Sequence, residues 1–473
     1  MPSSDTWDLI VIGGGSAGLV ASKTAAGFGA RVLLIERARL GGDCLWTGCV
    51  PSKALIAAAH DAATAARLGV NGGRGATFRS ARASVQHAIQ TIAPVDSREA
   101  LEADGVAVGA GQATFTSGRT VAVDGRELRF RQALIATGTS PAIPHISGAE
   151  SVHIRTSEDF WDLEDLPRRL VVLGGGAIGC ELGQAMARLG AEVTIVHRGS
   201  RILPKEEQEA SRAVLGSLQA DGVTVLTGRT ATSVRSADGR SGELTLDDGS
   251  TLEFDTLLAA LGREPHTRAL SLARAGVNLD PAGYVHVDSR LRTTNPRIWA
   301  AGDVTGLPKF THTAGVNGSV AATNAILGLR RKVETRVIPR VTFTAPEVAA
   351  VGVQAEHADP RRHRVVTWDH RHSDRAITES ATAGYTRVVV DRRGRILGGT
   401  IVSPRAGETV GELALSVKAG LTTSTLAGTT HPYPTFNDPL WNAAVADVRH
   451  RLGRGAAGAA VRGLRAIRAF VVR

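Results

Sequence analysis

The chain has 473 residues, 43% of them hydrophobic and 21% charged, so it is too long for a single hydrophobic core and predicts several globular domains. Its net charge of +10 raises the question of nucleic acid, but the arginines are spread through loops and helix faces without a nucleic-acid-binding motif, and we exclude that partner. Three cysteines do not make a secreted scaffold, and the N-terminus has neither the pattern of a signal peptide nor that of a membrane span. We therefore expect a cytoplasmic enzyme.

The first unit along the chain begins with an unbroken apolar run, DLIVI (8–12), which is typical of a parallel strand buried on both faces. It leads into GGGSAG (13–18), an alanine-rich helix and a second strand, RVLLI (31–35), that ends at Glu36. This order of strand, glycine turn, helix, strand and acid is the dinucleotide-binding fingerprint in its required context. The turn would hold a pyrophosphate at the helix N-terminus and the acid a ribose hydroxyl. The residues predicted to bind are Gly13, Gly15, Gly18 and Glu36.

The segment GGDCLWTGCVPSK (41–53) contains two of the three cysteines, Cys44 and Cys49. An ideal α-helix would separate their Cα atoms by roughly 8–9 Å, more than the roughly 7 Å that a disulfide spans. The segment must therefore tighten before the helix begins, and Gly48 supplies the backbone freedom. Pro51 fits the first turn of the following helix, whose N-terminus would stabilise a nearby thiolate. We interpret the pair as a redox-active dithiol and not as two buried, inert thiols.

The dinucleotide unit then recurs. A strand at 170–173 leads into GGGAIG (174–179), a helix and a strand at 192–196 that ends before His197. The spacing from the first glycine of the turn to the residue after the second strand is the same in both copies, which indicates a repeated module. Each copy is followed by a predicted meander with an Asp-Gly turn and by an apolar strand that ends in glycine, at 133–138 and 257–262. Two such modules predict two dinucleotides, and the second turn adds Gly174, Gly176 and Gly179 to the binding residues.

The second copy differs where cofactor specificity is set. His197 stands where the first copy has an acid, and Arg198 and Arg201 follow. An acid would repel the 2′-phosphate of NADPH, whereas an imidazole beside guanidinium groups would attract it. We therefore predict NADPH, and not NADH, at the second site. Surface residues of a basic protein are the alternative interpretation.

The last third of the chain changes character. After the strand IWAAGD (298–303), Val- and Thr-rich strands and a helix near 408–419 indicate a separate α+β domain that ends in HPYPTFND (431–438). The tail, Arg449–Arg473, has apolar residues at helical spacing with arginines between them. Such a helix can lie on an anionic membrane surface, but we favour packing against its own subunit or a partner.

With two nucleotide modules and a CxxxxC segment within the first, the chain resembles the class I pyridine nucleotide–disulfide oxidoreductases from about Trp7 to Asp438. This flavoprotein family includes lipoamide dehydrogenase, glutathione reductase and mercuric reductase, and the redox segment is most similar to the mercuric-reductase-like members. The resemblance implies an α/β fold with two Rossmann-like nucleotide-binding domains, for FAD and NAD(P), plus a C-terminal α+β dimerisation domain in a homodimer. The expected parts are a discontinuous FAD-binding domain at 1–150 and 275–335, an NAD(P)H-binding domain at 151–274, the dimerisation domain at 336–448 and a basic amphipathic tail at 449–473.

The resemblance also implies roles for individual residues. Lys53 would lie near the flavin ring, Asp303 would hold the ribitol, and Glu181 would lie near the nicotinamide. Cys49 would be the sulfur next to the flavin and Cys44 the outer thiol that attacks the substrate. The HPYPTFND segment would reach the partner's disulfide. The remaining residues that we place at the cofactor sites are Asp43, Ala113, Gly138 and Gly262.

The departures from the family pattern bear on the substrate. Disulfide-exchanging members carry a His immediately before Pro-Thr and a Glu five residues after that His, whereas this chain has Tyr433 and Asp438. A phenol is a poor base at neutral pH, although it can donate a hydrogen bond or contact a metal. His431 lies about 6–7 Å away along an extended chain and is interpreted as structural. The vicinal cysteine pair of mercuric reductases is not found at this C-terminus, so we do not expect efficient turnover of thiol-bound mercury. Cys180 is interpreted as a core residue.

We therefore predict a flavoprotein that passes electrons from NADPH through FAD to the Cys44–Cys49 disulfide and on to a soft metal ion, a quinone or a small electrophile. No resident metal is expected. The alternatives are dihydrolipoamide dehydrogenase or disulfide reductase activity with an unconventional proton donor, and a partner- or membrane-docked electron-transfer flavoprotein.

Overall fold

The computed structural model describes residues 6–70 and 73–471, which divide into two compact units. Unit 1 contains the described residues of Met1–Gly174, Ala185–Val196 and Arg229–Val333. Unit 2 contains those of Gly175–Gln184, His197–Gly228 and Glu334–Arg473. The boundary passes through helix α6 (Ala177–Leu189). The four-part domain division expected from the sequence stays a prediction.

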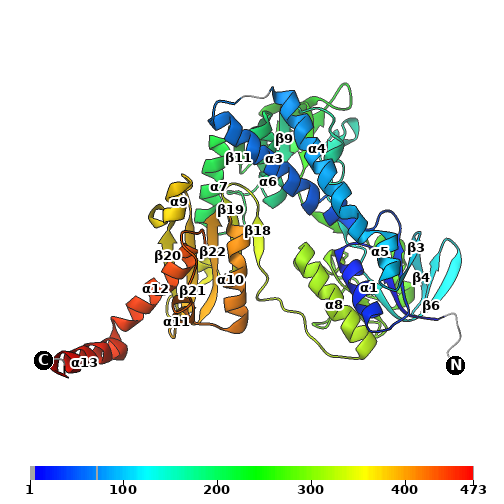
Figure 1. Cartoon of the computed structure of the whole chain (residues 1–473). Coiled ribbons are helices and arrows are strands. Elements are labelled where there is room, and N and C mark those ends of the chain that lie inside the picture. Colours follow the sequence, from blue (N-terminus) through cyan, green and yellow to red (C-terminus); the bar gives the residue numbers. More distant parts are fainter. Residues whose placement is uncertain (1–5, 71–72, 472–473) are drawn as a thin grey trace. The chain divides into compact units, whose positions relative to one another are not determined.

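A seven-stranded sheet forms the centre of the first part of unit 1 (Figure 1). Its order is β3-β2-β1-β6-β5-β4, with β17 paired to β6. β1 lies parallel between β2 and β6, so that Ile10 pairs with Leu33 on one side and with Ala133 on the other. The strands are β1 (Thr6–Ile12), β2 (Val32–Glu36), β3 (Val106–Ala110), β4 (Ala113–Ser117), β5 (Thr120–Val123), β6 (Arg126–Ile135) and β17 (Ile298–Ala300).

Both faces of this sheet are buried, which explains the unbroken apolar run of β1. Leu9 and Val11 point to one face and pack with residues of α1 (Ser16–Gly27) and α8 (Thr311–Leu327). Ile10 and Ile12 point to the other face, towards the cluster that contains Phe115. α1 and α8 contact each other along their length and lie side by side in Figure 1.

The two copies of the nucleotide module differ after their meanders. The sequence predicts a meander strand and then a separate strand in each copy. In the first copy this is wrong, because β6 runs without interruption from its antiparallel pairing with β5 into its parallel pairing with β1. In the second copy β14 (Thr251–Phe254) and β15 (Thr256–Ala259) are separate strands, and the side chain of Asp255 between them accepts hydrogen bonds from the backbone and guanidinium nitrogens of Arg169.

Two long helices of unit 1, α3 and α4, pack against each other, and the first turn of α3 contains the second half of the redox segment. The strands of a second sheet that belong to unit 1 have the order β10-β9-β15-β8, and unit 1 also contains a three-stranded antiparallel sheet, β12-β13-β14, and a pair, β7 and β16. The remaining elements of this region are α2 (Gly42–Trp46), α3 (Cys49–Arg67), α4 (Arg74–Ile92), α5 (Arg98–Ala103), β7 (Thr139–Pro141), β8 (Ile154–Arg155), β9 (Arg169–Leu173), β10 (Glu192–His197), β12 (Ala231–Arg235), β13 (Gly242–Leu246), β14 (Thr251–Phe254), β15 (Thr256–Ala259) and β16 (Arg263–Pro265).

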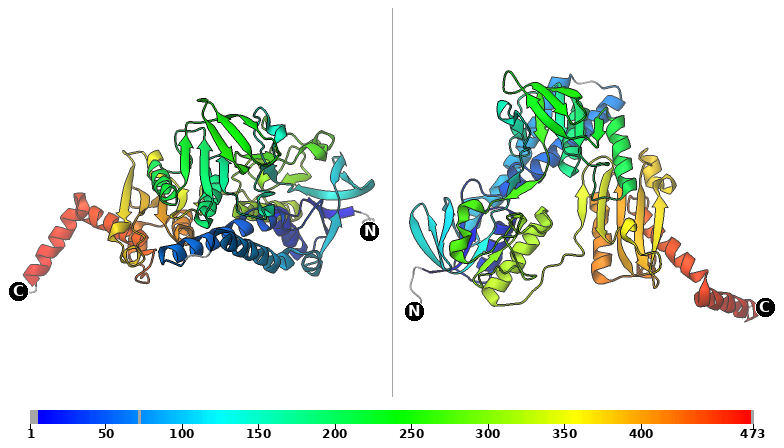
Figure 2. Two further views of the ribbon diagram at one scale, coloured as in Figure 1. Left: turned by 90° about the horizontal axis from the view of Figure 1, so that it is seen from above. Right: turned by 180° about the vertical axis from the view of Figure 1, so that it is seen from behind.

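A five-stranded antiparallel sheet with the order β18-β19-β22-β21-β20 forms the centre of unit 2. Its buried face packs on α10 and α12 around Val351, Ile401 and Leu413 (Figure 2, yellow strands and orange helices). The elements of unit 2 are α7 (Gln208–Ala220), β11 (Thr224–Thr227), β18 (Arg340–Thr342), β19 (Glu347–Gly352), β20 (His363–Asp369), α9 (Asp374–Thr378), β21 (Tyr385–Asp391), β22 (Ile396–Ser403), α10 (Ala406–Ala419), α11 (Thr423–Ala427), α12 (Asp438–Leu452) and α13 (Gly455–Val471). Sequence analysis missed β19, which pairs with both β18 and β22.

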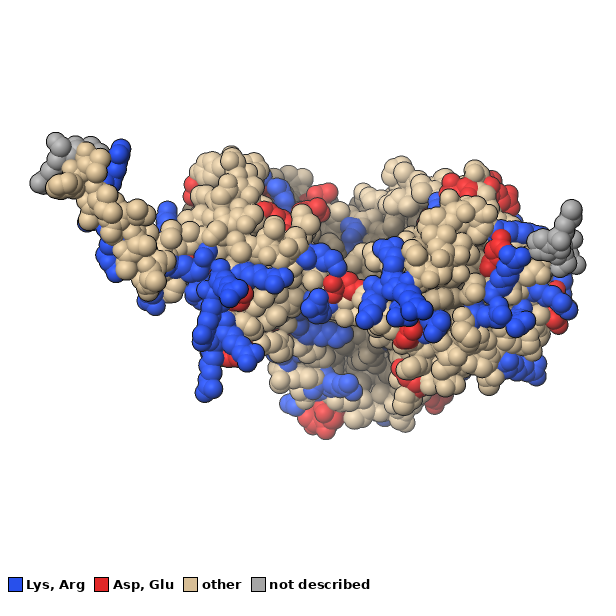
Figure 3. All heavy atoms as spheres, turned by 90° about the horizontal axis from the view of Figure 1, so that it is seen from below, with Lys and Arg blue, Asp and Glu red and all other residues tan. Residues whose placement is uncertain are grey.

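The C-terminal tail contains the end of one helix and the whole of a second. Residues Arg449–Leu452 complete α12, and α13 begins after the break at Gly453 and Arg454. Figure 2 shows α13, in red, extending away from the sheet of unit 2. Figure 3 shows blue Lys and Arg atoms along this helix among tan atoms of uncharged residues. Among the described residues, no helix combines the length and the apolar character that crossing a bilayer requires.

Candidate active site

The first glycine turn connects β1 to α1 in a conformation that requires glycine. Gly13 has a φ of +108°, and a Cβ there would lie 2.4 Å from the carbonyl oxygen of Ala136. A Cβ at Gly18 would lie 1.8 Å from the carbonyl oxygen of Gly13, so α1 packs directly on the strand end. Gly15 is the N-cap and has no side chain to bond the first amides of α1. These amides fit the pyrophosphate of FAD at a positive helix end.

Glu36 lies at the end of β2 beside this turn, as predicted. Its carboxylate accepts one hydrogen bond from the backbone nitrogen of Gly14 at 2.6 Å and another from that of Ala38 at 2.8 Å. The side chain is therefore fixed in place before a ligand binds. A carboxylate in this position fits a ribose diol, which would donate to it.

The two cysteines lie in consecutive helices. Cys44 lies within α2, and Cys49 is the first residue of α3. Between them a Cβ at Gly48 would lie 2.9 Å from the carbonyl oxygen of Asp43, so only glycine allows the two short segments to approach this closely. Pro51 lies in the first turn of α3. The tightening expected from the spacing of the cysteines is thus present.

Hydrogen bonding gives the two thiols opposite character. A hydrogen bond from the Cys44 thiol, together with Thr311 and the positive charge of Lys53, lowers the pKa of Cys49 to about 6. The Sγ of Cys49 lies 3.2 Å from the hydroxyl oxygen of Thr311, at the start of α8. The same contact with Cys49 is the largest cause that raises the pKa of Cys44, and burial is the second. In the reduced pair Cys49 therefore carries the negative charge and Cys44 retains its proton.

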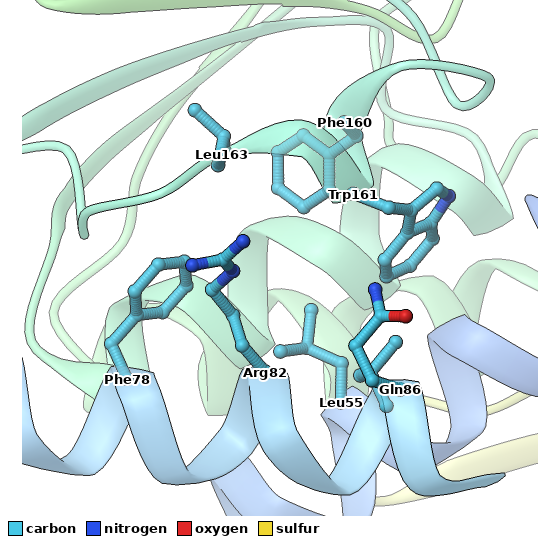
Figure 4. Close-up of a pocket in the computed structure, with 8 residues that line it drawn as sticks. Leu55, Phe78, Arg82, Gln86, Phe160, Trp161 and Leu163 are labelled. Carbon is cyan, nitrogen blue, oxygen red and sulfur yellow. The ribbon is translucent and has the colours of Figure 1, made fainter. Parts of the chain in front are cut away.

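The indole of Trp161 holds the segment between the cysteines. Its Nε1 donates to the carbonyl oxygen of Thr47 at 2.9 Å and to that of Ser157 at 2.8 Å. Figure 4 shows Trp161 beside a small cavity between α3, α4 and residues 160–163. Its volume of about 20 Å³ leaves room for about one water molecule, so it is too small to be a substrate site. It is lined by Leu55, Phe78, Arg82, Val85, Gln86, Phe160, Trp161 and Leu163.

Arg263 connects two of the predicted acids. Its Nη2 bonds the carboxylate of Asp43 at 2.5 Å, and its Nε donates to the hydroxyl of Thr139 at 2.7 Å. That hydroxyl donates to Asp303 at 3.3 Å, and burial raises the pKa of Asp303. Asp43 also accepts from the hydroxyl of Thr47. Asp43 therefore positions the redox segment, whereas Asp303 is a half-buried acceptor that fits a ribitol hydroxyl.

At the other positions predicted to contact FAD, the chain provides only backbone groups or open space. Ala113 begins β4 with a buried side chain, so it offers only backbone groups. Gly138 and Gly262 have φ angles of +67° and +147°, and no described atom lies within 4 Å of a Cβ built on either. These two glycines therefore leave open space after β6 and β15.

The second glycine turn repeats the geometry of the first. Gly174 has a φ of +117°, and a Cβ there would lie 2.3 Å from the carbonyl oxygen of Ala260. Gly176 has open space around the position of a Cβ, and Gly179 is buried. The turn thus fits a second dinucleotide.

His197 acts on this turn in the same way as Glu36 acts on the first. Its Nδ1 accepts a hydrogen bond from the backbone nitrogen of Gly175 at 3.2 Å. Burial is the main cause that lowers the pKa of the imidazole, and the positive charge of Arg198 is the second. The imidazole is therefore neutral, with its proton on Nε2. Arg201 donates to the carbonyl oxygens of Glu206 and Pro204. Arg198 is exposed, and its contact with a 2′-phosphate stays a prediction.

Glu181, the acid expected near the nicotinamide, lies in the first half of α6. Its side chain is buried and accepts from the backbone nitrogen of Phe343 at 2.9 Å. This bond fixes the carboxylate within unit 2. Its role towards the nicotinamide stays a prediction.

The HPYPTFND segment of unit 2 exposes its tyrosine and buries its acid. Tyr433 is 72% exposed, and its hydroxyl donates to Asp374, which raises the pKa of the phenol. Asp438 is buried and accepts from the backbone nitrogen of Thr435 at 3.1 Å. Tyr433 is therefore available to a second subunit or a substrate, whereas Asp438 supports the turn before α12.

His431 is held in place by two acceptors. Its Nδ1 lies 2.9 Å from the carbonyl oxygen of Thr429, and its Nε2 lies 2.9 Å from the carboxylate of Glu412. Glu412 also accepts from the side chain of Asn437. Because both ring nitrogens face acceptors, neither is directed towards a substrate proton. This geometry supports the interpretation of His431 as structural.

Sequence reasoning missed four residues that shape the site: Thr311, Trp161, Arg263 and Glu412. Arg263 directly follows the glycine that ends the strand at 257–262, which is a local signal that could have pointed to it. The other three come from distant parts of the chain and have no such signal. Among the described residues, no group of three or more His, Cys, Asp or Glu side chains is arranged to hold a metal ion.

This fold and this dithiol define a flavoprotein oxidoreductase that couples a nicotinamide dinucleotide to a pair of reactive sulfurs. Residues 7–318 match the family model for pyridine nucleotide-disulphide oxidoreductases, and residues 338–444 match the dimerisation domain of that family. The chain belongs to the pyridine nucleotide-disulphide oxidoreductase family. The predicted family, the α/β fold with a dimerisation domain, and FAD and NAD(P)H as the cofactors are confirmed.

Several relatives match over nearly the whole chain. A mercuric reductase from Streptomyces lividans is 37% identical over 93% of this chain and 95% of its own length. A dihydrolipoyl dehydrogenase from Thermus scotoductus is 35% identical over 93% of this chain and 97% of its own. Among solved structures, the Cu(II) complex of the HOCl-induced flavoprotein disulfide reductase RclA from Escherichia coli superposes with a TM-score of 0.85 at 26% identity, over 93% of this chain and 99% of that one.

Proposed function

We propose that the protein is an NADPH-dependent reductase that passes electrons through the Cys44–Cys49 pair to a soft metal ion. The observation that carries this proposal is the chemistry of the HPYPTFND segment. Tyr433 stands where disulfide exchange requires a base, and Asp374 raises its pKa, so the phenol donates a hydrogen bond and does not accept a proton at neutral pH. His431, the nearest imidazole in the segment, has both ring nitrogens committed.

The thiol pair suits a soft cation. Cys49 is already a thiolate near neutral pH, and Cys44 becomes one when a cation replaces its proton. Thiolates select soft metals over hard ones. Bound FAD would relay two electrons between the nicotinamide and the sulfurs. Oxidation of one NADPH releases one proton and two electrons, which reduce one Hg(II) to Hg(0) or two Cu(II) to Cu(I). The relatives named for mercury and the Cu(II) complex support this acceptor class.

The preference for NADPH over NADH rests on Arg198. Its guanidinium is exposed beside the second glycine turn, where a 2′-phosphate would bind. The neutral His197 holds the turn and leaves the site without the negative charge that an acid would place there. In the homodimer that the dimerisation domain supports, Tyr433 would reach the thiols of the other subunit.

Disulfide exchange is the second candidate, because one relative is named a dihydrolipoyl dehydrogenase. Quinones and small electrophiles remain alternative acceptors for the same thiol pair. In the third reading the dithiol is inactive and the flavoprotein delivers electrons to a docked partner.

The test is NADPH oxidation by the holoenzyme with Hg(II), Cu(II), a quinone, glutathione disulfide and lipoamide as acceptors. We expect turnover with the metal ions and at most a few per cent of it with either disulfide. Cys44→Ser should abolish metal turnover and spare reduction of the flavin by NADPH. Cys180→Ser, which removes the buried third thiol, is the matched control and should keep full turnover. Full metal turnover by Cys44→Ser, or faster turnover with lipoamide than with any metal, would refute the proposal.

A further inference from the structure

Helix α13 presents an apolar face that unit 2 does not cover. Within this helix Gly458 alone is buried, whereas Leu464, Ile467 and Phe470 are 67%, 62% and 84% exposed. At 3.6 residues per turn Leu464, Ile467 and Val471 share one face, which Val461 and Phe470 flank. A row of large side chains exposed over several turns marks a docking surface.

The other face of α13 is positively charged. Arg462 lies opposite the apolar face and Arg465 lies at its edge, whereas Arg468 lies between Leu464 and Val461, where its long side chain can extend towards a polar layer. No acidic residue follows Asp447 in the sequence. The helix carries no carboxylate that could pair with these arginines, so its charge complements an anionic partner, whereas a second copy of the helix would offer no negative charge.

The base of the helix adds to this positive surface. A shallow cavity of about 430 Å³ lies where α12 meets α13. Asp447 pairs with both Arg364 and Arg451 behind the cavity wall, and no carboxylate is among the residues that line the cavity. The lining comprises Arg364, Arg392, His450, Arg451, Arg454, Gly455, Ala456 and Ala457.

We propose that α13 is an interfacial helix that docks the protein on a bilayer containing anionic lipids. Its apolar face would lie among the upper acyl chains, and its arginines would bond the phosphodiester groups of the lipids. A helix of this kind lies in the plane of the membrane surface and does not cross the bilayer. The proposal is independent of the electron acceptor, because no residue of the dithiol or of the glycine turns takes part in it.

The experiment measures co-sedimentation of the full-length flavoprotein with vesicles of phosphatidylcholine alone or with about one third phosphatidylglycerol. We expect binding to the anionic vesicles that weakens as salt is raised and that is absent with the neutral ones. Each arginine near an anionic surface contributes about a fivefold change in partition, so removal of three should lower it on the order of 100-fold. The test variant is Arg462→Gln, Arg465→Gln and Arg468→Gln combined.

Two further variants separate the two faces. Leu464→Ser with Ile467→Ser keeps the charge and should weaken binding about tenfold, because the apolar face no longer enters the acyl region. The charge-matched control replaces the exposed Arg126, Arg129 and Arg240 of unit 1 by Gln and should bind like the unaltered protein.

Several results would overturn the proposal. These are no binding to anionic vesicles, equal binding to neutral ones, or an equal loss of binding in the unit 1 control. A change of the oligomeric mass in light scattering when Leu464 and Ile467 are replaced would show that the face contacts a second copy of the chain instead.

Discussion

The contact between Thr311 and Cys49 gives a prediction that depends on one hydroxyl. In Thr311→Val the shape of the side chain is kept, but the hydrogen bond to the Cys49 sulfur at 3.2 Å is lost. Because this bond is one of the causes that lower the pKa of Cys49 to about 6, the variant should have a higher thiol pKa.

The size of the rise follows from the strength of the bond. A hydrogen bond to a charged group contributes about 1.5–3 kcal/mol, and one pKa unit corresponds to about 1.4 kcal/mol. Cys49 is exposed, so water replaces part of the lost interaction and the lower end applies. We expect a rise of about one unit, from about 6 to about 7.

The assay is alkylation of the reduced holoenzyme by iodoacetamide at a series of pH values, with the Cys49 peptide quantified by mass spectrometry. The rate should rise with pH to a plateau, because only the thiolate reacts. The midpoint reports the pKa. Because the pKa of Cys49 is lower in the folded protein than in an unfolded chain, the thiolate also stabilises the reduced fold. This stabilisation is complete at pH values above the ordinary pKa of a thiol, and it is lost as the pH falls through about 6.

Thr313 provides the matched control, two residues further along α8. Its hydroxyl is buried without a hydrogen-bond partner among the described residues, so Thr313→Val removes the same atom without a bond to the sulfur. Its midpoint should stay at that of the unaltered enzyme. An unchanged midpoint in Thr311→Val, or an equal rise in Thr313→Val, would refute the reasoning.

Three further predictions concern the cofactor site and the redox segment. Arg198→Ala should raise the KM for NADPH about tenfold and leave the KM for NADH nearly unchanged, because only NADPH has a 2′-phosphate that loses a charge-assisted bond. Equal changes in the two KM values would contradict the role of Arg198 in binding the 2′-phosphate. His197→Glu should shift the kcat/KM ratio towards NADH. Trp161→Phe should lower the free energy of unfolding by about 1–2 kcal/mol and alter the alkylation rate of Cys49, because the carbonyl of Thr47 loses its donor. Trp441→Phe, which loses a similar bond to the carbonyl of Ala427, should be destabilised without a change in that rate.

Local signals explain what could be predicted of this molecule. The apolar run of β1 and the glycines of the two turns indicate their structure because a buried strand and a positive φ each constrain residue type at the position itself. The same holds for Gly48, where the approach of Asp43 leaves no room for a side chain. The dithiol and both nucleotide turns were therefore within reach of sequence reasoning.

Contacts between distant segments explain what could not be predicted. Thr311 lies 262 positions from Cys49, and Trp161 lies 114 positions from Thr47, so no spacing in the sequence connects them. Glu412, whose carboxylate bonds His431, likewise lies on another helix, α10, and the sequence suggested no role for it. Thr311 contributes to the low pKa of Cys49, and Glu412 bonds the imidazole of His431, although neither residue belongs to the family motifs recognised in the sequence.

The two copies of the nucleotide module show that one position performs two separable tasks. Glu36 and His197 both accept a hydrogen bond from the second glycine of their turn, at 2.6 Å and 3.2 Å. The acceptor is needed in either case, because the turn would otherwise leave that amide unsatisfied. The charge is not needed for the turn: Glu36 brings a negative charge that suits a ribose diol, whereas the neutral imidazole keeps the hydrogen bond and removes the repulsion of a 2′-phosphate. Arg198 can then attract that phosphate without opposition, which is why the pair, and not either residue alone, accounts for the predicted preference for NADPH.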